Sequence, residues 1–316
     1  MQREDGKSVR VIVNGKNEGE PALEEAVQWA RRHGHRIELR ITRETGDAGR
    51  FAAEKTDAPA DIIAAAGGDG TVNEVLNGLM TVSGFPKPAL AIIPLGTAND
   101  LAIGCGIPQD EPAKALQLAW EGRPRRVDVG RANDRHFLNV ASGGFAADVA
   151  GKTPASIKNV LGGAAYAVTG LLSAGSITPY RSQLILPDEQ WEGDLIVITV
   201  GNGRQAGGGF PVAPKAALDD GLLDLMVIHD AGLLQSREVL NKMREAHVGE
   251  EDTYLFYKQV PAFRLELERE MRLDVDGEPL FDTRFDFSIL PRRLTLMLPA
   301  ETPLCWGPNQ PDHAGR

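Results

Sequence analysis

Residues 64–79 read AAAGGDGTVNEVLNGL and combine three local patterns in one short stretch. The run DIIAAA (Asp61–Ala66) is typical of a buried strand, and a glycine-rich turn leads from it into a segment with apolar residues at helical spacing. Thr71 and Glu74 stand three residues apart at the start of that segment, which predicts a capping box. The stretch therefore predicts a strand, a tight turn and a helix, the repeating unit of parallel α/β sheets.

The turn Gly67-Gly68-Asp69-Gly70-Thr71 has a chemistry that suits phosphate groups. A helix that begins after glycines offers free backbone N–H groups and the positive end of its dipole. A carboxylate there would repel a bare phosphate, so we expect Asp69 to hold a metal-bound water, a ribose hydroxyl or an incoming hydroxyl nucleophile. The alternatives are a turn-forming role for Asp69 and a purely capping role for Glu74.

The same pattern extends on both sides of this stretch. Because each strand-like run is followed by a helix-like segment, the sequence predicts a parallel sheet covered by helices. A second glycine turn, PLGTAND (Pro94–Asp100), follows the last run and places small and acidic residues at the same carboxyl-terminal edge, where ligands of open α/β sheets bind. The other predicted strands of this part are Val9–Gly15, His35–Thr42 and Ala89–Leu95.

From about Arg125 the pattern changes to strands at short intervals, which predicts antiparallel β structure. The segment from Val127 to Phe145 has the pattern of a hairpin, and two helical segments, Ser156–Ala174 and Leu233–Ala246, interrupt the later strands. The first of these segments suits either buried packing or a surface that faces lipid. The later predicted strands are LIVITVGNG (195–203), LLDLMVIHD (222–230), FRLELE (263–268), MRLDVDG (271–277), FDFSIL (285–290) and LTLMLP (294–299).

Composition restricts the class of protein. A chain of 316 residues with 42% hydrophobic content predicts two globular domains, and its net charge of −10 disfavours general binding of nucleic acid. The N-terminus has no apolar signal core, and no run reaches the roughly 18 apolar residues that span a bilayer. Cys105 and Cys305 stand far apart, which suggests neither a disulfide framework nor a zinc site. We therefore expect a cytoplasmic protein without a stable membrane anchor.

Eight motifs spread over nearly the whole chain resemble the diacylglycerol kinase catalytic-domain superfamily, and within it the YegS-like bacterial lipid kinases. They are VNGK (13–16), RITRETGDAGR (40–50), AGGDGTVNEV (66–75), PLGTANDLA (94–102), FLNVASGGF (137–145), GNGRQAGGGF (201–210), ALDDGLLDL (217–225) and DGEPL (276–280).

The resemblance implies a fold and a division of the chain. Residues 1–130 would form an α/β nucleotide-binding domain related to NAD kinases and diacylglycerol kinases. Residues 131–292 would form an antiparallel β-sandwich, residues 293–306 would return to the first domain, and residues 307–316 would form a flexible tail. The active site would lie in the cleft between the two domains.

The resemblance also implies roles for individual residues. The carboxylate of Asp220 and the backbone carbonyls of Ala217 and Leu222 would bind a metal, and such an all-oxygen ligand set suits Mg²⁺ or Ca²⁺. Glu278 would be the general base. Read without the family, ALDDGL is an ordinary turn and Glu278 a surface residue after an Asp-Gly hairpin turn. An acidic network would comprise Asp69, Asp100 and Asp128. Nucleotide contacts would come from Thr42, Gly67, Gly68, Asp69, Gly70, Thr71, Val72, Asn73, Glu74 and Thr97.

The implied activity is transfer of the ATP γ-phosphoryl group to a lipid hydroxyl at the membrane surface. The YegS-like motifs favour phosphatidylglycerol as acceptor, with diacylglycerol as the alternative. Transient contact with the inner face of the membrane would use a local basic cluster, Arg123, Arg125 and Arg126, which could equally be a solvated loop. A NAD kinase shares the GGDGT turn, and a sensor that binds nucleotide or lipid without turnover is a further alternative.

Overall fold

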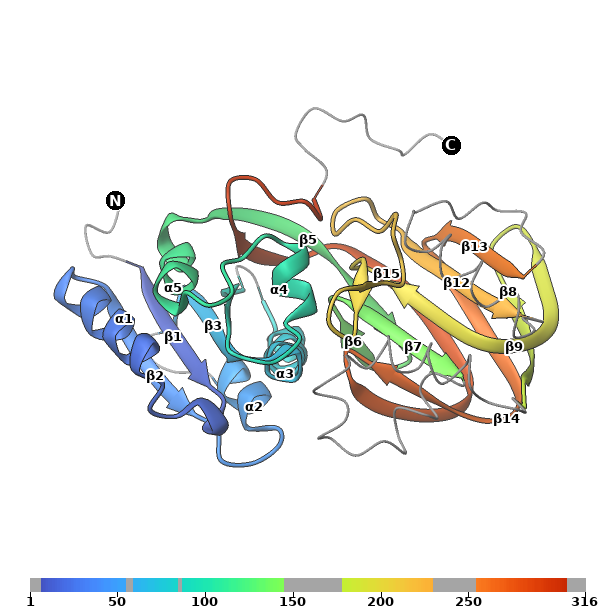
Figure 1. Ribbon diagram of the computed structural model, residues 1–316, viewed down its shortest axis with the longest axis horizontal. Helices are drawn as coiled ribbons and strands as arrows, with labels where there is room; N and C mark the ends of the chain where they lie inside the picture. Colours follow the sequence, from blue (N-terminus) through green and yellow to red (C-terminus); the bar gives the residue numbers. More distant parts are fainter. Residues whose placement is uncertain (1–6, 55–58, 85–86, 145–177, 230–253, 306–316) are drawn as a thin grey trace. The chain divides into compact units, whose positions relative to one another are not determined.

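The computed structural model describes residues 7–54, 59–84, 87–144, 178–229 and 254–305. The chain divides into two compact units, whose elements are labelled in Figure 1. Unit 1 comprises Met1–Val127 with Arg292–Cys305, and unit 2 comprises Asp128–Pro291 with Trp306–Arg316. The helical segments expected near residues 156–174 and 233–246, and the expected tail from residue 307, lie outside the described residues.

Unit 1 contains the expected parallel sheet, in the order β4–β3–β1–β2. The register pairs Val13 with both Ile41 and Ala66, and Gly67 with Pro94, so the carboxyl ends of all four strands meet at one edge. The last part of β15 (Glu278–Leu298) lies parallel to β4, with Leu296 opposite Leu90. The four strands are β1 (Ser8–Val13), β2 (Arg36–Ile41), β3 (Ile62–Gly67) and β4 (Ala89–Pro94).

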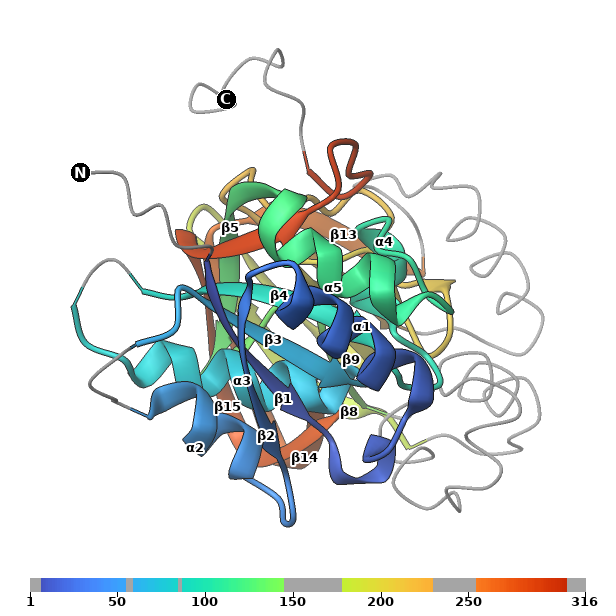
Figure 2. The same cartoon turned by 90° about the vertical axis from the view of Figure 1, so that its left-hand side faces the viewer.

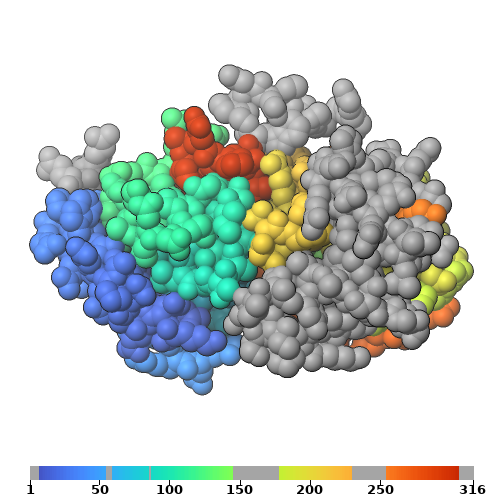
Figure 3. Space-filling model, viewed as in Figure 1, coloured from blue at the N-terminus to red at the C-terminus, as the bar shows by residue number. Residues whose placement is uncertain are grey.

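Helices cover both faces of this sheet. Figure 2 shows α1 and α5 on one face and α2 and α3 on the other, and Figure 3 shows the surface of the molecule in the view of Figure 1. Val72, Val75, Leu76 and Leu79, the apolar face predicted for α3, are all buried. The elements are η1 (Gly15–Asn17), α1 (Pro21–Arg32), α2 (Asp47–Ala53), α3 (Asp69–Thr81), α4 (Asp100–Gly104) and α5 (Pro112–Glu121).

Unit 2 is the expected antiparallel β-sandwich. Its strands run in the order β13–β12–β9–β7–β14–β15, and β8 pairs with both β9 and β14. Phe285, Phe287, Met271 and Leu225 lie in the larger of two apolar clusters between these strands. The strands are β5 (Arg123–Ala132), β6 (Arg135–Phe137), β7 (Val140–Gly144), β8 (Tyr180–Ile185), β9 (Gln190–Gly201), β10 (Gln205–Ala206), β11 (Phe210–Pro211), β12 (Leu223–His229), β13 (Leu255–Val260) and β14 (Ala262–Val275).

The strand pattern expected for unit 2 is confirmed in one hairpin and differs in other strands. The hairpin expected after Arg125 is present, with Ala132 opposite Arg135. FRLELE and MRLDVDG, expected as two strands, are one strand, β14, whose register shifts between Glu266 and Met271. FDFSIL and LTLMLP are likewise both part of β15. The strands β8 and β13 were not predicted.

Among the described residues, no helix is long and apolar enough to cross a membrane.

Candidate nucleotide and metal sites

Three chain segments are joined by hydrogen bonds at the carboxyl edge of the unit 1 sheet. The segment after β1 contacts both neighbours: the Asn14 Nδ2 group donates to Thr71 Oγ1 at 3.0 Å, and the Gly15 N–H donates to Thr42 Oγ1 at 3.0 Å. A Cβ atom on Gly15 would lie 2.4 Å from the Thr42 carbonyl oxygen, so only glycine fits at this position. Thr42 and Thr71, two predicted nucleotide contacts, therefore lie on either side of the Asn14-Gly15 segment.

The two glycine turns that the sequence pairs are packed directly against each other. A Cβ atom on Gly96 would lie 2.4 Å from the Cα atom of Gly68, and one on Gly68 would lie 3.2 Å from the Cα atom of Gly96. The Asn99 side chain fixes the second turn, since its Oδ1 accepts from the Gly96 N–H and its Nδ2 donates to the Gly96 carbonyl, both at 3.0 Å. The close approach of GGDGT and PLGTAND thus depends on glycine at both positions.

The start of α3 has the properties of an anion-binding helix terminus. Gly68 is the N-cap residue and supplies no side-chain hydrogen bond to the first turn. A Cβ atom on Gly70 would meet nothing within 4 Å, so the space beside this turn is open. Backbone N–H groups at such a terminus attract phosphate oxygens. Gly68 and Gly70 therefore have the geometry of a phosphate-binding turn, and Thr97 is exposed in the second turn.

Asp69 links the starts of two helices. Its Oδ2 atom accepts a hydrogen bond from the Asp100 N–H, the first residue of α4, at 3.4 Å. Burial, followed by the neighbouring charge of Asp100, raises the pKa of the Asp69 carboxyl, and backbone N–H donors of α4 partly offset this. The structure thus brings together two of the three predicted acidic residues, Asp69 and Asp100, within unit 1.

The predicted capping box at Thr71 and Glu74 is wrong. Because α3 begins at Asp69, Thr71 already lies in the first turn, and Glu74 is too far along the helix to reach the N-cap. The Glu74 Oε2 atom instead accepts from the N–H groups of Gly46 at 3.1 Å and Ala48 at 3.2 Å, at the start of α2. Glu74 therefore caps a different helix from the one that carries it.

Two other residues of the predicted nucleotide set also have side chains that face the interior of unit 1. Val72 is buried in the core. Asn73 is buried as well, and its side-chain oxygen accepts from Asn77 Nδ2 at 3.1 Å. Together with Gly67, whose Cβ position is filled by Thr71, these residues shape the turn from within.

The predicted metal loop lies in unit 2 and is fixed by Asp128. The fully buried Asp128 donates its N–H to the Leu218 carbonyl at 2.6 Å, and its Oδ2 atom accepts from the Gly221 N–H at 2.7 Å. The Asp220 Oδ1 atom accepts from the Leu222 N–H at 3.0 Å, which turns the chain back on itself. The third residue of the expected acidic network therefore contacts the metal loop.

Negative charge accumulates around this loop. Burial raises the pKa of Asp220 to about 7, with further contributions from Asp224, Asp128 and Asp219 and an opposing one from the Leu222 N–H. A divalent cation would offset this charge, and the oxygen ligands are the type that Mg²⁺ and Ca²⁺ prefer. No group of three His, Cys, Asp or Glu side chains in the described part of the chain could hold a metal by itself. The buried, mutually repelling carboxylates of this loop suit a hard divalent cation, and the ligand roles of Ala217, Asp220 and Leu222 stay predictions.

The structure adds Asp224, which the sequence interpretation did not include. It is fully buried in β12, accepts a hydrogen bond from the Tyr257 hydroxyl, and accepts two more from Gln259 Nε2 at 3.2 and 3.3 Å. Burial raises its pKa to about 6 despite these donors. The signal in the sequence was an acidic residue within the otherwise apolar run LLDLMVIH.

Glu278 begins β15 immediately after the Asp276-Gly277 turn, and it pairs with Val275 across that turn. Both turn residues have positive φ, 48° for Asp276 and 89° for Gly277, which confirms the expected Asp-Gly hairpin. Glu278 is half-buried. The predicted base and metal loop thus belong to unit 2, whereas the predicted nucleotide residues belong to unit 1.

Of the three clustered arginines, one has a structural bond. Arg126 donates from Nε to the Arg292 carbonyl at 2.9 Å and so ties β5 to the returning chain within unit 1. Arg123 is exposed and Arg125 half-buried at the start of β5.

Comparisons with known proteins match both parts of the chain. Residues 8–132 match the diacylglycerol kinase catalytic domain, and residues 139–298 match the YegS C-terminal NAD kinase beta sandwich-like domain. A Chromohalobacter salexigens protein described as a probable YegS-like lipid kinase is 42% identical over 92% of this chain and 92% of its own length. A protein of the same description from Pectobacterium atrosepticum is 40% identical over 93% of this chain and 97% of its own length.

Solved structures show the same architecture. The crystal structure of a diacylglycerol kinase from Bacillus anthracis has a TM-score of 0.70 and 25% identity, and covers 93% of this chain and 97% of that one. Another structure from that organism reaches a TM-score of 0.78 at 27% identity, covering 95% and 99% of the two chains. Since both domain types match over nearly the whole chain, the protein belongs to the YegS-like lipid kinases, phosphotransferases with a diacylglycerol kinase catalytic domain and a YegS C-terminal domain.

Proposed function

We propose that this lipid kinase transfers the γ-phosphoryl group of ATP to a hydroxyl of phosphatidylglycerol, with diacylglycerol as the alternative acceptor. The observation that carries the nucleotide part is the close packing of Gly68 against Gly96 beside the uncapped start of α3. The choice of phosphatidylglycerol rests on the resemblance of the sequence motifs to YegS-like kinases, and the similarity to a probable YegS-like lipid kinase over 92% of the chain supports a lipid as acceptor.

The nucleotide residues of the proposal lie at the carboxyl edge of the unit 1 sheet. The N–H groups at the start of α3 would hold phosphate oxygens, and Thr42 and Thr97 would contact the nucleotide beside them. Phosphoryl transfer depends mainly on positioning and on stabilisation of charge, so no covalent enzyme intermediate is needed. Asp69 and Asp100 would orient the groups around the phosphates.

The Asp220 carboxylate and the carbonyls of Ala217 and Leu222 would hold Mg²⁺, or alternatively Ca²⁺. When bound, the ion would supply positive charge that neutralises phosphate oxygens. Asp128 would keep the loop in shape through its bond to Gly221.

Glu278 would act as general base. Its carboxylate would take the proton of the lipid hydroxyl as the hydroxyl oxygen forms a bond to the γ-phosphorus. The bond from the γ-phosphorus to the bridging oxygen breaks in line with this attack, and ADP leaves with that electron pair. The nucleotide residues of the proposal belong to unit 1, and Glu278 and the metal loop belong to unit 2.

A radiolabelled ATP assay tests the proposal, with phosphatidylglycerol, diacylglycerol and other bacterial lipids in mixed micelles and NAD as a non-lipid acceptor. We expect label in phosphatidylglycerol, and activity that requires a divalent ion. Label in diacylglycerol alone would correct the acceptor. Label in NAD without lipid would show a NAD kinase, and ATP binding without any labelled product would show a sensor.

Glu278→Gln is the direct test of the base, because it keeps the size of the side chain and removes its basicity. We expect kcat to fall about a hundredfold or more, with ATP affinity by calorimetry and the melting temperature unchanged. Loss of ATP binding together with turnover would place Glu278 at the nucleotide instead. Full activity would return it to an ordinary surface residue.

A further inference from the structure

The turn that carries Glu278 is held by a carboxylate two residues earlier. Asp276 accepts three backbone hydrogen bonds from consecutive residues, at 2.9 Å from Leu138, 3.1 Å from Asn139 and 2.9 Å from Val140. The Asp276 N–H also donates to the Val140 carbonyl at 3.0 Å. Hydrogen bonds to an ionised acceptor are stronger than neutral ones, so the turn is firmly attached to the 138–140 segment.

The 138–140 segment is also hydrogen-bonded to the turn at Asn202 and Gly203. The Asn139 carbonyl accepts from the N–H groups of Asn202 at 2.9 Å and Gly203 at 2.8 Å. The Asn202 Nδ2 group donates to the Leu138 carbonyl at 2.8 Å and to the Asp128 carbonyl at 3.3 Å. Asn202 is fully buried, so these bonds are shielded from water.

Asp128 in turn bonds to Leu218 and Gly221 of the metal loop. A continuous chain of hydrogen bonds therefore runs within unit 2 from the Glu278 turn, through the 138–140 segment and Asn202, to the loop that carries Asp220. The Asp276 carboxylate attaches the Glu278 turn to this chain, in addition to the strand pairing of Val275 with Ala141.

We propose that Asp276 is a positioning residue for phosphoryl transfer, which fixes the backbone of Glu278 relative to the metal loop. This inference rests on the proposed role of Glu278 as base. A base must lie within hydrogen-bond reach of the proton that it removes, and small displacements of a reacting group can reduce the rate up to about a hundredfold. Asp276 acts only through Glu278 and contacts no substrate itself.

Asp276→Asn tests the role with little change of shape. Asparagine tolerates the positive φ of this position, and its side-chain oxygen can still accept a hydrogen bond. Its NH₂ group replaces the second acceptor oxygen, so one of the backbone N–H groups faces a donor. The turn is then attached less firmly to the 138–140 segment. We expect kcat to fall about tenfold or more, in line with the sensitivity of rate to position, with the KM for ATP and the calorimetric ATP affinity unchanged.

A double-mutant cycle with Glu278→Gln gives the decisive measurement. If Asp276 works through the base, Asp276→Asn should lower turnover in the wild-type background and leave the residual turnover of Glu278→Gln nearly unchanged. An equal fold-loss in both backgrounds would overturn the positioning role while the base stands. Wild-type turnover in Glu278→Gln would overturn the base and the positioning role together.

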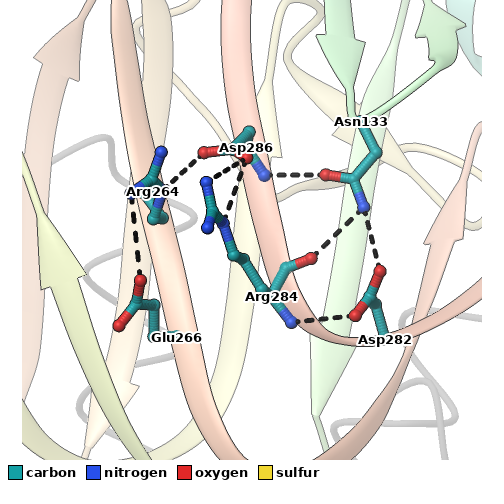
Figure 4. Close-up of polar contacts among 6 residues, drawn as sticks. All are labelled: Asn133, Arg264, Glu266, Asp282, Arg284 and Asp286. Carbon is teal, nitrogen blue, oxygen red and sulfur yellow. Dashed lines mark hydrogen bonds and ion pairs between the residues drawn. The ribbon is translucent and has the colours of Figure 1, made fainter.

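Asp282→Asn is the matched control on the same strand. Asp282 also accepts a backbone N–H from Thr283 at 2.7 Å. It accepts a second from Arg284 at 3.2 Å and a hydrogen bond from Asn133 Nδ2 at 3.3 Å (Figure 4). We expect this variant to keep wild-type turnover. If Asp276→Asn does not fold, Asp276→Gly replaces it, since glycine keeps the turn and removes the carboxylate. Failure of both to melt cooperatively would show that Asp276 serves stability alone and would overturn the proposal.

Discussion

Asp69 bears its negative charge where burial and the neighbouring Asp100 both disfavour it. Because its pKa is raised in the folded state, the group contributes stability that is fully present below the unfolded pKa and is lost as pH rises through the folded pKa. Above the folded pKa the ionised carboxylate therefore destabilises the fold, which points to a functional reason for its presence.

Asp69→Asn removes this charge and keeps an acceptor for the Asp100 N–H. We expect a melting temperature at pH 7 equal to or above that of the wild type, together with a loss of turnover of about a hundredfold or more. The difference in melting temperature should vanish near pH 3, where the wild-type carboxyl is protonated as well. Wild-type turnover in the variant would rule out the proposed role of Asp69. A lower melting temperature at pH 7 would show that the buried carboxylate does not destabilise the fold.

Asp220→Ala removes the single side-chain ligand proposed for the metal. We expect the divalent ion concentration for half-maximal rate to rise at least about tenfold, because charge and ligand number set affinity at such sites. Glu270→Ala, which removes an exposed carboxylate from β14 and leaves the metal loop intact, is the control in the same titration. An unchanged ion dependence in Asp220→Ala would leave ALDDGL as a structural turn.

Among the elements, α2 depends on a residue of α3. Glu74 caps the first turn of α2, so Glu74→Ala should lower the free energy of unfolding by about 1 kcal/mol, the usual effect of losing a helix cap. Glu25→Ala removes an exposed carboxylate from α1 and serves as control in the same urea titration. A fall in ATP affinity with unchanged stability would instead support the predicted nucleotide contact of Glu74.

The elements that could be predicted are those with regular local patterns. Apolar runs separated by helical segments predicted the parallel strands of unit 1. The dipeptide Asp276-Gly277 predicted the hairpin turn between β14 and β15. β14 was divided in two because exposed charged residues, Glu268, Arg269 and Glu270, interrupt the alternation beside its register shift. The capping box was wrong because the spacing of Thr71 and Glu74 does not reveal where the helix starts. The contacts of Asp128, Asn202 and Asp224 are between residues far apart in the chain, which no local pattern can show.

On the scale of the whole molecule, a lipid kinase must meet its substrate in a bilayer, yet its net charge is −10. Arg123 and Arg125 offer local positive charge, whereas Arg126 is tied to Arg292. We expect co-sedimentation with vesicles rich in anionic lipid to fall with rising salt and with the double substitution Arg123→Gln and Arg125→Gln. Arg32→Gln with Lys114→Gln removes the same charge elsewhere and should have no effect. Sedimentation that is indifferent to the first pair would reject this surface.

The path of β15 has a consequence for biosynthesis. The strand begins in unit 2 with Glu278, and Leu296 near its end pairs with Leu90 of β4 in unit 1, about 200 residues earlier in the chain. Residues 128–291, which supply the described strands of unit 2, leave the ribosome before the strand that completes the unit 1 sheet. The edge of β4 therefore stays unpaired through most of synthesis, against the usual order in which the N-terminal domain folds first. A nascent chain stalled before Arg292 should accordingly expose the nucleotide half to proteases, even though every predicted nucleotide contact has already been translated.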